Sequence, residues 1–530
     1  MTYRRSQARR AKQGKISDWV DLPDSVFTDL GVDRGTLAAF ENALVGSILL
    51  PGEADYKAAS RATFQMSSEK PKIIVYCEIE ADVRLCLAWA RRHKWWVVPR
   101  SGGHSTAAYS VNNEMVIDIS RMNHITVDGD LKQVRVGAGA NFGRLNAALD
   151  SHRLHMPGGL CEDVGIAGYM QGGGYGLTVR EFGMNCDNVI SFRMMLRDGR
   201  TVTANASKNA DLYWAVRGGT GNNFGILLDI TYRLHEVWKL WAFGIRWEAD
   251  DAAAALCRLQ ERYMRTGAPP KLGYMVVISH RSDLDGRPIL MLRGTYNGSQ
   301  ADGRKEIAGL LEIGQPTVEI DSVETYYRLE TLLYETPVPI IDPPHGPELK
   351  EDKQAGFIAK MMSERDWQAV LDYYIQTSPV PYNAIAIEPY GGAINAIAPD
   401  ACAYVHRDVD MDFFVDSFWT DDGDRDAAVA WLDGFMDLMA PHFNGGVYQN
   451  YPRRGLTDYR RRYWGGNHDR LLAVKQKYDP VPHMFYFEQG ICTGPDDPGV
   501  PIDGGAPADF TAAPIVFEPH TDSGNSADTE

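Results

Sequence analysis

The chain has 530 residues, of which 44% are hydrophobic and 23% charged, a globular composition in a chain too long for one ordinary core. Its net charge of −16 argues against nucleic acid as a partner, because phosphate binding needs a dense basic surface. No run approaches the roughly 18 apolar residues of a transmembrane helix, so we expect no membrane partner either.

The N-terminal arm and the cysteines favour a cytoplasmic protein. Residues Met1 to Lys15 are basic, and the apolar stretch of a signal peptide does not follow them. The 7 cysteines are scattered along the chain without the spacing of a zinc site. We therefore expect no metal site and a reducing compartment.

Residues 72–150 predict alternating strands and helices. Apolar, β-rich runs predict strands at 72–79, 95–99 and 115–119, and Asp128-Gly129 predicts the turn of a hairpin over 125–136. Between the first two strands, apolar side chains recur at helical spacing and predict a helix over Glu80–His93. A short amphipathic helix is expected over Asn141–Asp150.

A glycine loop, Arg100-Ser-Gly-Gly-His-Ser105, follows directly on the second of these strands. Glycine lets backbone N–H groups approach a ligand, and successive N–H groups form an anion nest that would hold a pyrophosphate. A tight turn that needs positive φ accounts for the same residues equally well. We reject NAD binding, because Gly172–Gly176 lacks the spacing of the dinucleotide fingerprint.

Glycine density then rises and falls along the chain. The segment Gly158–Gly176 has 8 glycines in 19 residues, and a second cluster, Arg217–Gly225, follows a helix-like DLYWAV segment. From about residue 238 glycine thins, and helical segments such as Asp251–Arg265 alternate with strand-like runs such as Tyr274–Ser279. A composition rich in glycine, tyrosine and asparagine returns near residue 447. We interpret the middle of the chain as an inserted domain.

In this order, the motifs resemble those of the berberine bridge enzyme-like flavoproteins, which belong to the vanillyl-alcohol oxidase superfamily. The N-terminal motifs are Arg100-Ser-Gly-Gly-His104, Pro157-Gly-Gly-Leu-Cys161-Glu-Asp-Val-Gly165, Gly168–Gly176, Asp211–Gly218 and Asn223-Phe-Gly-Ile226. The C-terminal motifs are Tyr448-Gln-Asn-Tyr451, Tyr463-Trp-Gly-Gly-Asn467 and Lys475-Gln-Lys-Tyr-Asp-Pro480. The resemblance covers about residues 50 to 492.

The resemblance implies an α+β fold of the vanillyl-alcohol oxidase type with two domains. Both chain ends would build an FAD-binding domain, and a central substrate-binding domain would carry an antiparallel sheet covered by helices. We expect an arm and lead-in at 1–50, the first part of the FAD-binding domain at 51–236, the substrate-binding domain at 237–440, the C-terminal part of the FAD-binding domain at 441–492 and a tail at 493–530.

The resemblance also implies bicovalent FAD, bonded at the 8α position to His104 and at C6 to Cys161. A thiolate can attack an electron-poor ring carbon, and a neutral imidazole has a nitrogen to alkylate. Two tethers would fix the ring and strengthen it as an oxidant. Other residues expected at the cofactor are Arg100, Ser101, Gly102, Gly103, Ser105, Pro157, Gly158, Val164, Gly165, Gly168, Gly172, Gly174, Gly176, Gly225, Ile226 and Asn450.

Oxidation of a hydroxyl group needs a base for the proton and flavin N5 for the hydride. The resemblance points to tyrosines as the proton-handling groups, namely Tyr451 and Tyr448 in the closing motif and Tyr175 beside the flavin. The pKa of free tyrosine is about 10, so a phenolate base needs a nearby cation or hydrogen-bond donors. The sequence does not identify that cation. If residues 448–451 form a strand, the two tyrosines point to opposite faces, and we favour Tyr451 as the base.

Glu388 and Tyr390 lie on an expected strand of the central domain, where the resemblance places substrate-contacting groups. An exposed carboxylate is an equal alternative for Glu388. The arginines within 453–462 are either a contact for an acidic substrate or a solvated face. Tyr169, where histidine is frequent in the family, and Pro452-Arg-Arg454 depart from the family pattern and leave the substrate open.

Val164 bears on the electron acceptor. The resemblance implies that valine at this position leaves room for oxygen, whereas leucine or isoleucine blocks it. We therefore expect an oxidase that uses O2, produces H2O2 and acts on a hydroxyl group of a carbohydrate, an oligosaccharide or a glycosylated secondary metabolite. A dehydrogenase or oxidative cyclase with another acceptor, and a flavin-binding protein without turnover, remain alternatives. The sequence does not determine the oligomeric state.

Overall fold

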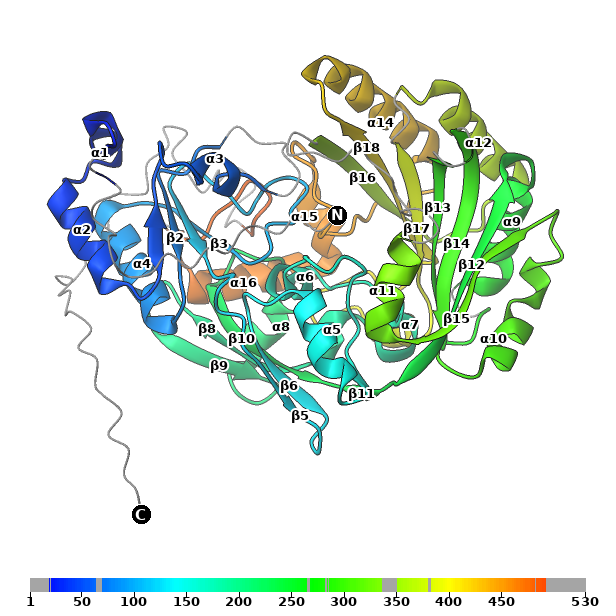
Figure 1. The fold of residues 1–530 in the computed structure, drawn as a ribbon, viewed down its shortest axis with the longest axis horizontal. Helices are drawn as coiled ribbons and strands as arrows, with labels where there is room; N and C mark the ends of the chain where they lie inside the picture. Colours follow the sequence, from blue (N-terminus) through cyan, green and yellow to red (C-terminus); the bar gives the residue numbers. More distant parts are fainter. Residues whose placement is uncertain are drawn as a thin grey trace.

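The structure, a computed structural model, describes residues 19, 21–62, 69–264, 267–281, 284, 286–335, 350–379, 383–481 and 483–491. The predicted basic arm at 1–15 and the tail at 493–530 lie outside these residues. Segments near both ends of the described chain build one part of the molecule, and the middle of the chain builds the other (Figure 1). This is the two-domain α+β architecture expected from the sequence.

A small sheet near the start of the chain carries the first glycine loop. Its strands, in spatial order, are β1 (Ser47–Leu49), β2 (Ile73–Tyr76), β4 (Met115–Asp118) and β3 (Val97–Arg100). Strand β4 runs parallel to both β2 and β3, so the loop after Arg100 leaves the carboxyl edge of the sheet. Three helices precede or follow β1, namely α1 (Asp24–Leu30), α2 (Arg34–Ala43) and α3 (Tyr56–Ala59).

Helix α4 (Glu80–His93) connects β2 to β3 and begins and ends at the predicted residues. Its apolar face is fully buried, with Val83, Cys86 and Leu87 each 0% exposed. Asp82 in the first turn accepts backbone N–H groups from Val45 and Gly46, at 2.8 and 3.1 Å. A carboxylate is favourable at a helix N-terminus, and here it also anchors the lead-in to β1.

A second, antiparallel sheet holds the glycine-rich segment. Its order is β5 (Ile125–Asp128), β6 (Gln133–Gly137), β10 (Ile226–Arg233), β8 (Val189–Met195) and β9 (Thr201–Asn205). The predicted β5–β6 hairpin is confirmed. The chain between β6 and β8 forms α5 (Phe142–Asp150), β7 (Leu154–His155), α6 (Ile166–Gln171) and α7 (Val179–Phe182), and α8 (Ala210–Val216) precedes β10. Helix α5 has the predicted extent, and Asn141 caps it by accepting Arg144 N–H at 3.1 Å.

The middle of the chain forms one sheet of seven antiparallel strands. Their order is β15 (Thr317–Thr325), β12 (Lys239–Glu248), β14 (Arg287–Tyr296), β13 (Leu272–Arg281), β17 (Ala384–Pro389), β18 (Met411–Trp419) and β16 (Lys350–Ile358). Strand β11 (His235–Glu236), just before β12, pairs instead with β7. The strand expected over Tyr274–Ser279 is the centre of β13.

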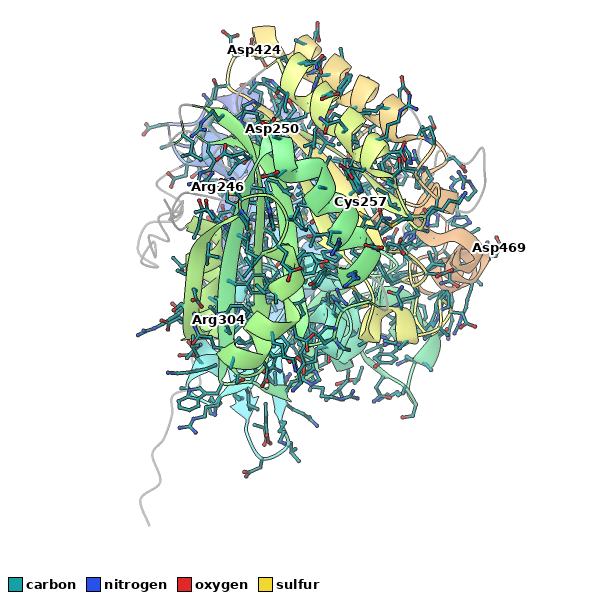
Figure 2. The ribbon with its side chains drawn as sticks, turned by 90° about the vertical axis from the view of Figure 1, so that its right-hand side faces the viewer. Arg246, Asp250, Cys257, Arg304, Asp424 and Asp469 are labelled. Atoms are coloured by element: carbon teal, nitrogen blue, oxygen red, sulfur yellow. The ribbon has the colours of Figure 1, made fainter. Side chains whose placement is uncertain are left out.

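Three helices cover the outer face of this sheet: α9 (Ala249–Tyr263), α12 (Glu364–Thr377) and α14 (Arg425–Met439) (Figure 1). Their apolar faces and the outward strand residues form one core, to which Trp247, Trp367 and Phe435 contribute. Helix α9 starts two residues earlier than predicted. Figure 2 looks onto this helix-covered side, with Asp250 and Cys257 of α9 labelled. The opposite face of the sheet is turned toward the part built from both ends of the described chain (Figure 1).

Shorter elements connect the two parts. Helix α11 (Tyr326–Glu335) lies between α5 and β12, while α10 (Gln300–Glu306) and α13 (Ala393–Ala396) lie in loops of the central part. The C-terminal helices α15 (Tyr459–Trp464) and α16 (His468–Tyr478), orange in Figure 1, return to the part that contains the first two sheets. There the buried Lys475 Nζ lies 2.7 Å from Asp479 Oδ2 and donates to Asn223 O at 2.6 Å. Two separate sequence motifs thus form one buried contact.

Candidate active site

The loops that carry His104 and Cys161 pack against each other. A Cβ on Gly102 would lie 2.3 Å from Gly165 N, so the backbones meet at a distance that only glycine allows. His104 Nε2 lies 3.0 Å from Asp163 Oδ1, two residues after Cys161. The two residues proposed as flavin attachment points, 57 positions apart in the sequence, therefore lie on adjoining loops.

The side chains on these loops fit a flavin. The His104 side chain is 19% exposed and Cys161 is half-buried, so both reach a surface shared by the loops. Cys161 forms a hydrogen bond with Tyr334 on α11, and its charge, together with burial, raises the pKa of that tyrosine well above its ordinary value. A Cβ on Gly168 would meet no atom within 4 Å, which shows open space beside α6. An imidazole and a thiol on adjoining loops are the two groups that double attachment of FAD would use.

The remaining residues of the first glycine loop are held by the protein itself. Arg100 is fully buried, and its Nε lies 2.6 Å from Asp118 Oδ2. Ser101 Oγ donates to Ala138 O at 2.8 Å, and Ser105 Oγ accepts Tyr109 N–H at 3.1 Å. Gly103 has a φ of 78°, as the tight turn considered from the sequence requires. The contact of these residues with the cofactor remains a prediction.

The second glycine segment is fixed by close backbone contacts. A Cβ on Gly176 would lie 1.9 Å from Gly158 O, and Pro157 O accepts Asn185 Nδ2 at 2.7 Å. Val164 is half-buried against the main core. Gly225 and Ile226 sit at the start of β10, where a Cβ on Gly225 would lie 2.5 Å from Met195 O. These glycines allow the close packing that brings the loops together.

The closing motif lies directly against this segment. A Cβ on Gly172 would lie 1.9 Å from Asn450 Oδ1. Tyr448 Oη accepts the backbone N–H groups of Gly174 and Tyr175, each at 3.0 Å, and Asn450 Nδ2 at 2.9 Å. Residues 274 positions apart are thus hydrogen-bonded, and the C-terminal part of the chain completes the site.

The strand considered for residues 448–451 is wrong. These residues form a turn, closed by a hydrogen bond from Tyr451 N to Tyr448 O at 2.9 Å. The two tyrosine rings consequently lie together, 4.9 Å apart in an edge-to-face arrangement, rather than on opposite faces. The alternation rule fails here because the donors on the glycine segment hold Tyr448 and bend the chain.

Tyr451 and Glu388 form a hydrogen-bonded pair. Tyr451 Oη donates to Glu388 Oε1 at 3.0 Å. Glu388 lies on β17 and is 7% exposed, so the alternative of an exposed carboxylate does not apply. Burial raises the pKa of Glu388 to about 7, against the opposing influence of the Tyr451 hydrogen bond and of Lys353. Burial and the nearby Glu388 raise the pKa of Tyr451 well above its ordinary value.

Tyr175 links the glycine segment to the same strand. Its hydroxyl donates to Pro389 O, next to Glu388, at 2.8 Å. Its ring stacks on Tyr390 with centroids 5.5 Å apart, and Tyr390 is hydrogen-bonded to Tyr404. Tyr175 is 5% exposed and Tyr448 is 1% exposed, whereas Tyr451 is half-buried. Of the three predicted tyrosines, Tyr451 is the most accessible.

A cation, Lys353 on β16, lies beside Tyr451. Its Nζ lies 4.4 Å from the centroid of the Tyr451 ring and 4.4 Å from that of Phe414. It also lies 3.0 Å from Asp416 Oδ1 and 3.5 Å from Glu351 Oε1. Although burial acts to lower it, these carboxylates raise the pKa of Lys353 above its ordinary value, which keeps the side chain charged.

A further carboxyl group, Asp412 on β18, is paired in register with Glu388. It is 0% exposed, and neither of its oxygens has a hydrogen-bond partner among the described residues. Burial, followed by the charge of Glu388, raises the pKa of Asp412 well above its ordinary value. Burial therefore favours the neutral form of Asp412 over a second carboxylate beside Glu388.

The arginines after the closing motif begin with two that are paired. Arg453 Nη2 lies 2.9 Å from Asp352 Oδ2, and Arg454 Nη2 lies 2.8 Å from Glu69 Oε1. Neither presents a free cation to an acidic substrate.

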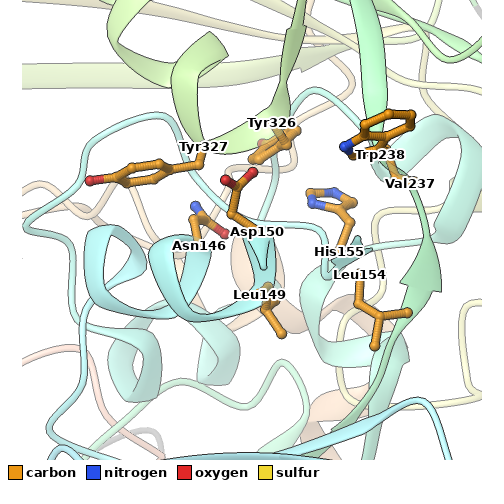
Figure 3. A pocket seen from close by; sticks show the side chains of 9 residues that line it. All are labelled: Asn146, Leu149, Asp150, Leu154, His155, Val237, Trp238, Tyr326 and Tyr327. Atoms are coloured by element: carbon orange, nitrogen blue, oxygen red, sulfur yellow. The ribbon is translucent and has the colours of Figure 1, made fainter. Parts of the chain in front are cut away.

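A small pocket between α5, β11 and α11 lies elsewhere (Figure 3). His155 lies in its lining, and its Nε2 is 2.7 Å from Thr178 Oγ1. Burial lowers the pKa of His155 to about 3, so the ring is neutral. Residues of the glycine loops and the Tyr451–Glu388 pair are absent from the lining, which is Asn146, Leu149, Asp150, Leu154, His155, Val237, Trp238, Tyr326 and Tyr327.

Among the described residues, no helix combines the length and the apolar character that a membrane-spanning helix needs.

Comparison with known proteins identifies the family of the chain. Residues 71–205 match the FAD binding domain family, and residues 447–492 match the berberine and berberine like family. The chain is 31% identical over 461 residues to the FAD-linked oxidoreductase YgaK of Bacillus subtilis, covering 84% of this chain and 97% of that protein. It is 26% identical over 506 residues to a carbohydrate oxidase of Microdochium nivale, covering 87% and 96%.

The fold recurs in a solved structure. Wild-type BBE-like 1 of Physcomitrella patens superposes with a TM-score of 0.78 at 24% identity, covering 86% of this chain and 99% of that one. Together with the match to YgaK, which spans nearly the whole relative, these comparisons establish the cofactor as FAD and the chemistry as oxidoreduction. The chain belongs to the berberine bridge enzyme-like family of FAD-linked oxidoreductases.

Proposed function

We propose that the protein binds FAD through both His104 and Cys161 and oxidises a hydroxyl group of a carbohydrate, an oligosaccharide or a glycosylated secondary metabolite, with O2 as acceptor and H2O2 as product. The observation that carries the activity is the hydrogen bond between Tyr451 and the buried Glu388. The sugar class is supported by the similarity to the carbohydrate oxidase of Microdochium nivale.

The Tyr451–Glu388 pair is a proton relay in this proposal. FAD, when bound, supplies the acceptor for the hydride that leaves the carbinol carbon. Tyr451 Oη takes the proton of the substrate hydroxyl and passes its own proton to Glu388 Oε1 along their 3.0 Å hydrogen bond. A free phenolate is not required, which agrees with the raised pKa of Tyr451. Lys353 favours the ionised form of Glu388, so that a carboxylate is ready to accept.

The other two tyrosines are more deeply buried than Tyr451, which argues against the same role. The oxygen of Tyr448 already accepts three N–H donors, and the hydroxyl of Tyr175 is committed to Pro389 O. We assign to Tyr448 the positioning of the glycine segment, and to Tyr175 the positioning of the end of β17 that carries Glu388.

This relay predicts a pH dependence. Glu388 must be ionised to accept a proton, and its pKa is raised to about 7. We expect kcat/KM to be low in acid, to rise with a single apparent pKa near 7 and to level off above it. A pH profile with a substrate whose chemical step limits turnover measures this. Glu388→Gln should remove the rise of kcat/KM with pH. A wild-type profile that is flat across neutral pH would contradict the relay.

A second prediction concerns oxygen. If the valine at 164 leaves room for O2, Val164→Ile should slow reoxidation of the reduced flavin by air by roughly tenfold or more, since one added methylene fills a space of that size. Reduction by substrate and turnover with a dye acceptor should stay near wild type. Stopped-flow reoxidation measures both steps. Equal oxygen rates in the two proteins would show that Val164 does not control access.

The proposed function is tested by anaerobic mixing of the holoprotein with a panel of mono- and oligosaccharides, simple alcohols and amines. Flavin bleaching by sugars, followed by H2O2 release when air is admitted, is expected. Bleaching with fast turnover only on a dye would make the protein a dehydrogenase. Bleaching by amines or alcohols alone would refute the carbohydrate class, and the absence of bleaching with every compound would favour a flavin-binding protein without turnover.

A further inference from the structure

Two buried cysteines from distant parts of the chain meet where the two parts of the molecule join. Cys186 lies in the short 3-10 helix η2 (Asn185–Asn188), and Cys402 lies in the loop after α13. Their sulfur atoms and an oxygen of Asp187 all lie within 4.8 Å of one another, and the two cysteines are at most 1% exposed. The Cys402 loop is fixed to the FAD-binding part, because Ala403 N donates to Trp214 O at 3.1 Å.

The hydrogen bond between the two sulfurs and a nearby guanidinium group favour a thiolate on Cys402 rather than on Cys186. Arg407 Nη2 donates to Cys402 Sγ at 3.3 Å, and the same side chain pairs with both oxygens of Asp187 at 2.7 and 2.8 Å. The hydrogen bond from Cys186, together with the charge of Arg407, lowers the pKa of Cys402 to about 6. Burial and the same hydrogen bond raise the pKa of Cys186 well above its ordinary value. The pair is therefore one thiolate beside one thiol.

A metal ion does not fit this cluster. Two sulfurs and a carboxylate form a plausible ligand set, but the guanidinium of Arg407 already supplies the positive charge that a cation would bring. A thiolate next to a thiol and an arginine is instead the arrangement of a reactive dithiol.

We propose that Cys186 and Cys402 form a redox-active pair that a hydroperoxide closes to a disulfide between the two parts of the molecule. The Cys402 thiolate attacks a peroxide oxygen, the O–O bond breaks, and Cys402 becomes a sulfenic acid while hydroxide takes up a proton to leave as water. The Cys186 sulfur then attacks the sulfenic sulfur, the S–S bond forms, and a second water leaves. Two thiols are oxidised by two electrons, and one H2O2 is reduced to two waters.

The Cys186–Cys402 pair contacts the backbone segment that also binds Tyr448 of the candidate active site. Cys186 N donates to Gly173 O at 2.9 Å, and the next residue, Gly174, donates to Tyr448. Arg407 lies 5.0 Å from the centroid of the Tyr404 ring, which packs against the Tyr448 ring at 6.1 Å. An S–S bond of about 2.05 Å would draw the loop of Cys402 toward the glycine segment. The proposed function supplies a source of peroxide, although the reactivity of the pair does not depend on that source.

The chain provides its own control. Cys77 and Cys86 are also fully buried, and their sulfurs lie 3.8 Å apart. Burial raises the pKa of Cys77 well above its ordinary value, and the nearby Cys86 and the carboxylates of Asp82 and Asp118 raise it further. Proximity alone would oxidise both pairs, whereas a cation-stabilised thiolate selects Cys186 and Cys402.

The test treats the full-length holoprotein with added H2O2, blocks remaining thiols under denaturing conditions and maps peptides by mass spectrometry. We expect a Cys186–Cys402 link that forms at least about tenfold faster than any Cys77–Cys86 link, at a rate that falls as the pH drops below about 6. Oxidised glutathione, which is too large to reach buried sulfurs, should not form the link. Cys86→Ser should leave the rate unchanged, and Cys402→Ser should abolish the link.

Several results would overturn the proposal. These are alkylated Cys402 after peroxide treatment of the folded protein, a sulfinic acid on Cys402 without a link, and equal rates for the two pairs. The measurement uses added peroxide and follows peptides, so it can fail while the carbohydrate test succeeds, and the reverse.

Discussion

Glu388→Gln should lower kcat/KM by roughly 10²- to 10⁴-fold while FAD remains bound, because the substitution removes the group that accepts the proton without changing the shape of the side chain. Tyr451→Phe should lose activity to a similar extent, since it removes the other half of the 3.0 Å hydrogen bond. Rapid-reaction kinetics of flavin reduction measures the effect on the step itself. Both variants should show unchanged flavin absorbance before substrate is added.

The losses of activity caused by the two substitutions should not be additive. If the groups act as one relay, the double variant should be about as slow as the slower single variant. Losses that multiply would show that the tyrosine and the carboxylate act separately. Glu181→Gln is a matched control, because Glu181 is a partly buried carboxyl on α7 whose pKa is also raised by burial but which is bonded to Asn297 at 2.8 Å. It should retain wild-type turnover.

The combined substitution His104→Ala with Cys161→Ala should release all of the flavin when the protein is precipitated with acid. Wild type and each single variant should keep a yellow pellet, because one bond is enough to retain the cofactor. The contact between His104 and Asp163 places both tethers on adjoining loops, so either can form without the other. Absorbance of the washed pellet and of the supernatant measures the outcome.

Cys257→Ser is the matched control for this series. Cys257 is also a half-buried thiol, but it lies on α9, on the helix-covered side of the large sheet (Figure 2). Its loss should leave the pellet yellow, alone or together with His104→Ala. A colourless pellet from wild type would contradict covalent attachment, and a yellow pellet from the double variant would point to a different attachment residue.

Local pattern was enough to predict much of the frame. Both ends of helix α4 were predicted correctly, because three signals agree there: apolar residues at helical spacing, an acidic residue in the first turn, and a strand that begins at Trp95. The glycine segments were expected at the cofactor because several motifs in the same order resemble those of the family; a glycine loop alone is explained equally well by a tight turn. The contact between the Asn223 and Lys475 motifs was not predicted, because it joins residues that are 252 positions apart in the sequence.

The chemical centre was predicted only in part. Glu388 and Tyr451 were named, but their contact joins two segments 63 residues apart and leaves no local signal. Lys353 was missed because it lies on a strand of mixed charged and apolar residues. A usable signal was present in β18, where Asp412 and Asp416 occupy one face of a strand whose other residues are apolar except for Ser417. Charged residues that alternate on a buried strand indicate a polar cluster beneath the sheet.

The turn at residues 448–451 shows why periodicity failed. The sequence Tyr448-Gln-Asn-Tyr451 carries no signal for a turn, yet Tyr448 is hydrogen-bonded to the N–H groups of Gly174 and Tyr175. Unpaired backbone donors in a glycine segment need an acceptor, and a tertiary contact supplied it. The local pattern could not anticipate a partner that lies so far away in the sequence.

Mass spectrometry of peptides from the fully flavinylated protein tests most directly whether two distant residues are both bonded to one cofactor. The account predicts a single flavin-bearing species in which the peptide containing His104 and the peptide containing Cys161 are joined through the isoalloxazine ring. Recovery of either peptide with its imidazole or thiol unmodified would contradict it.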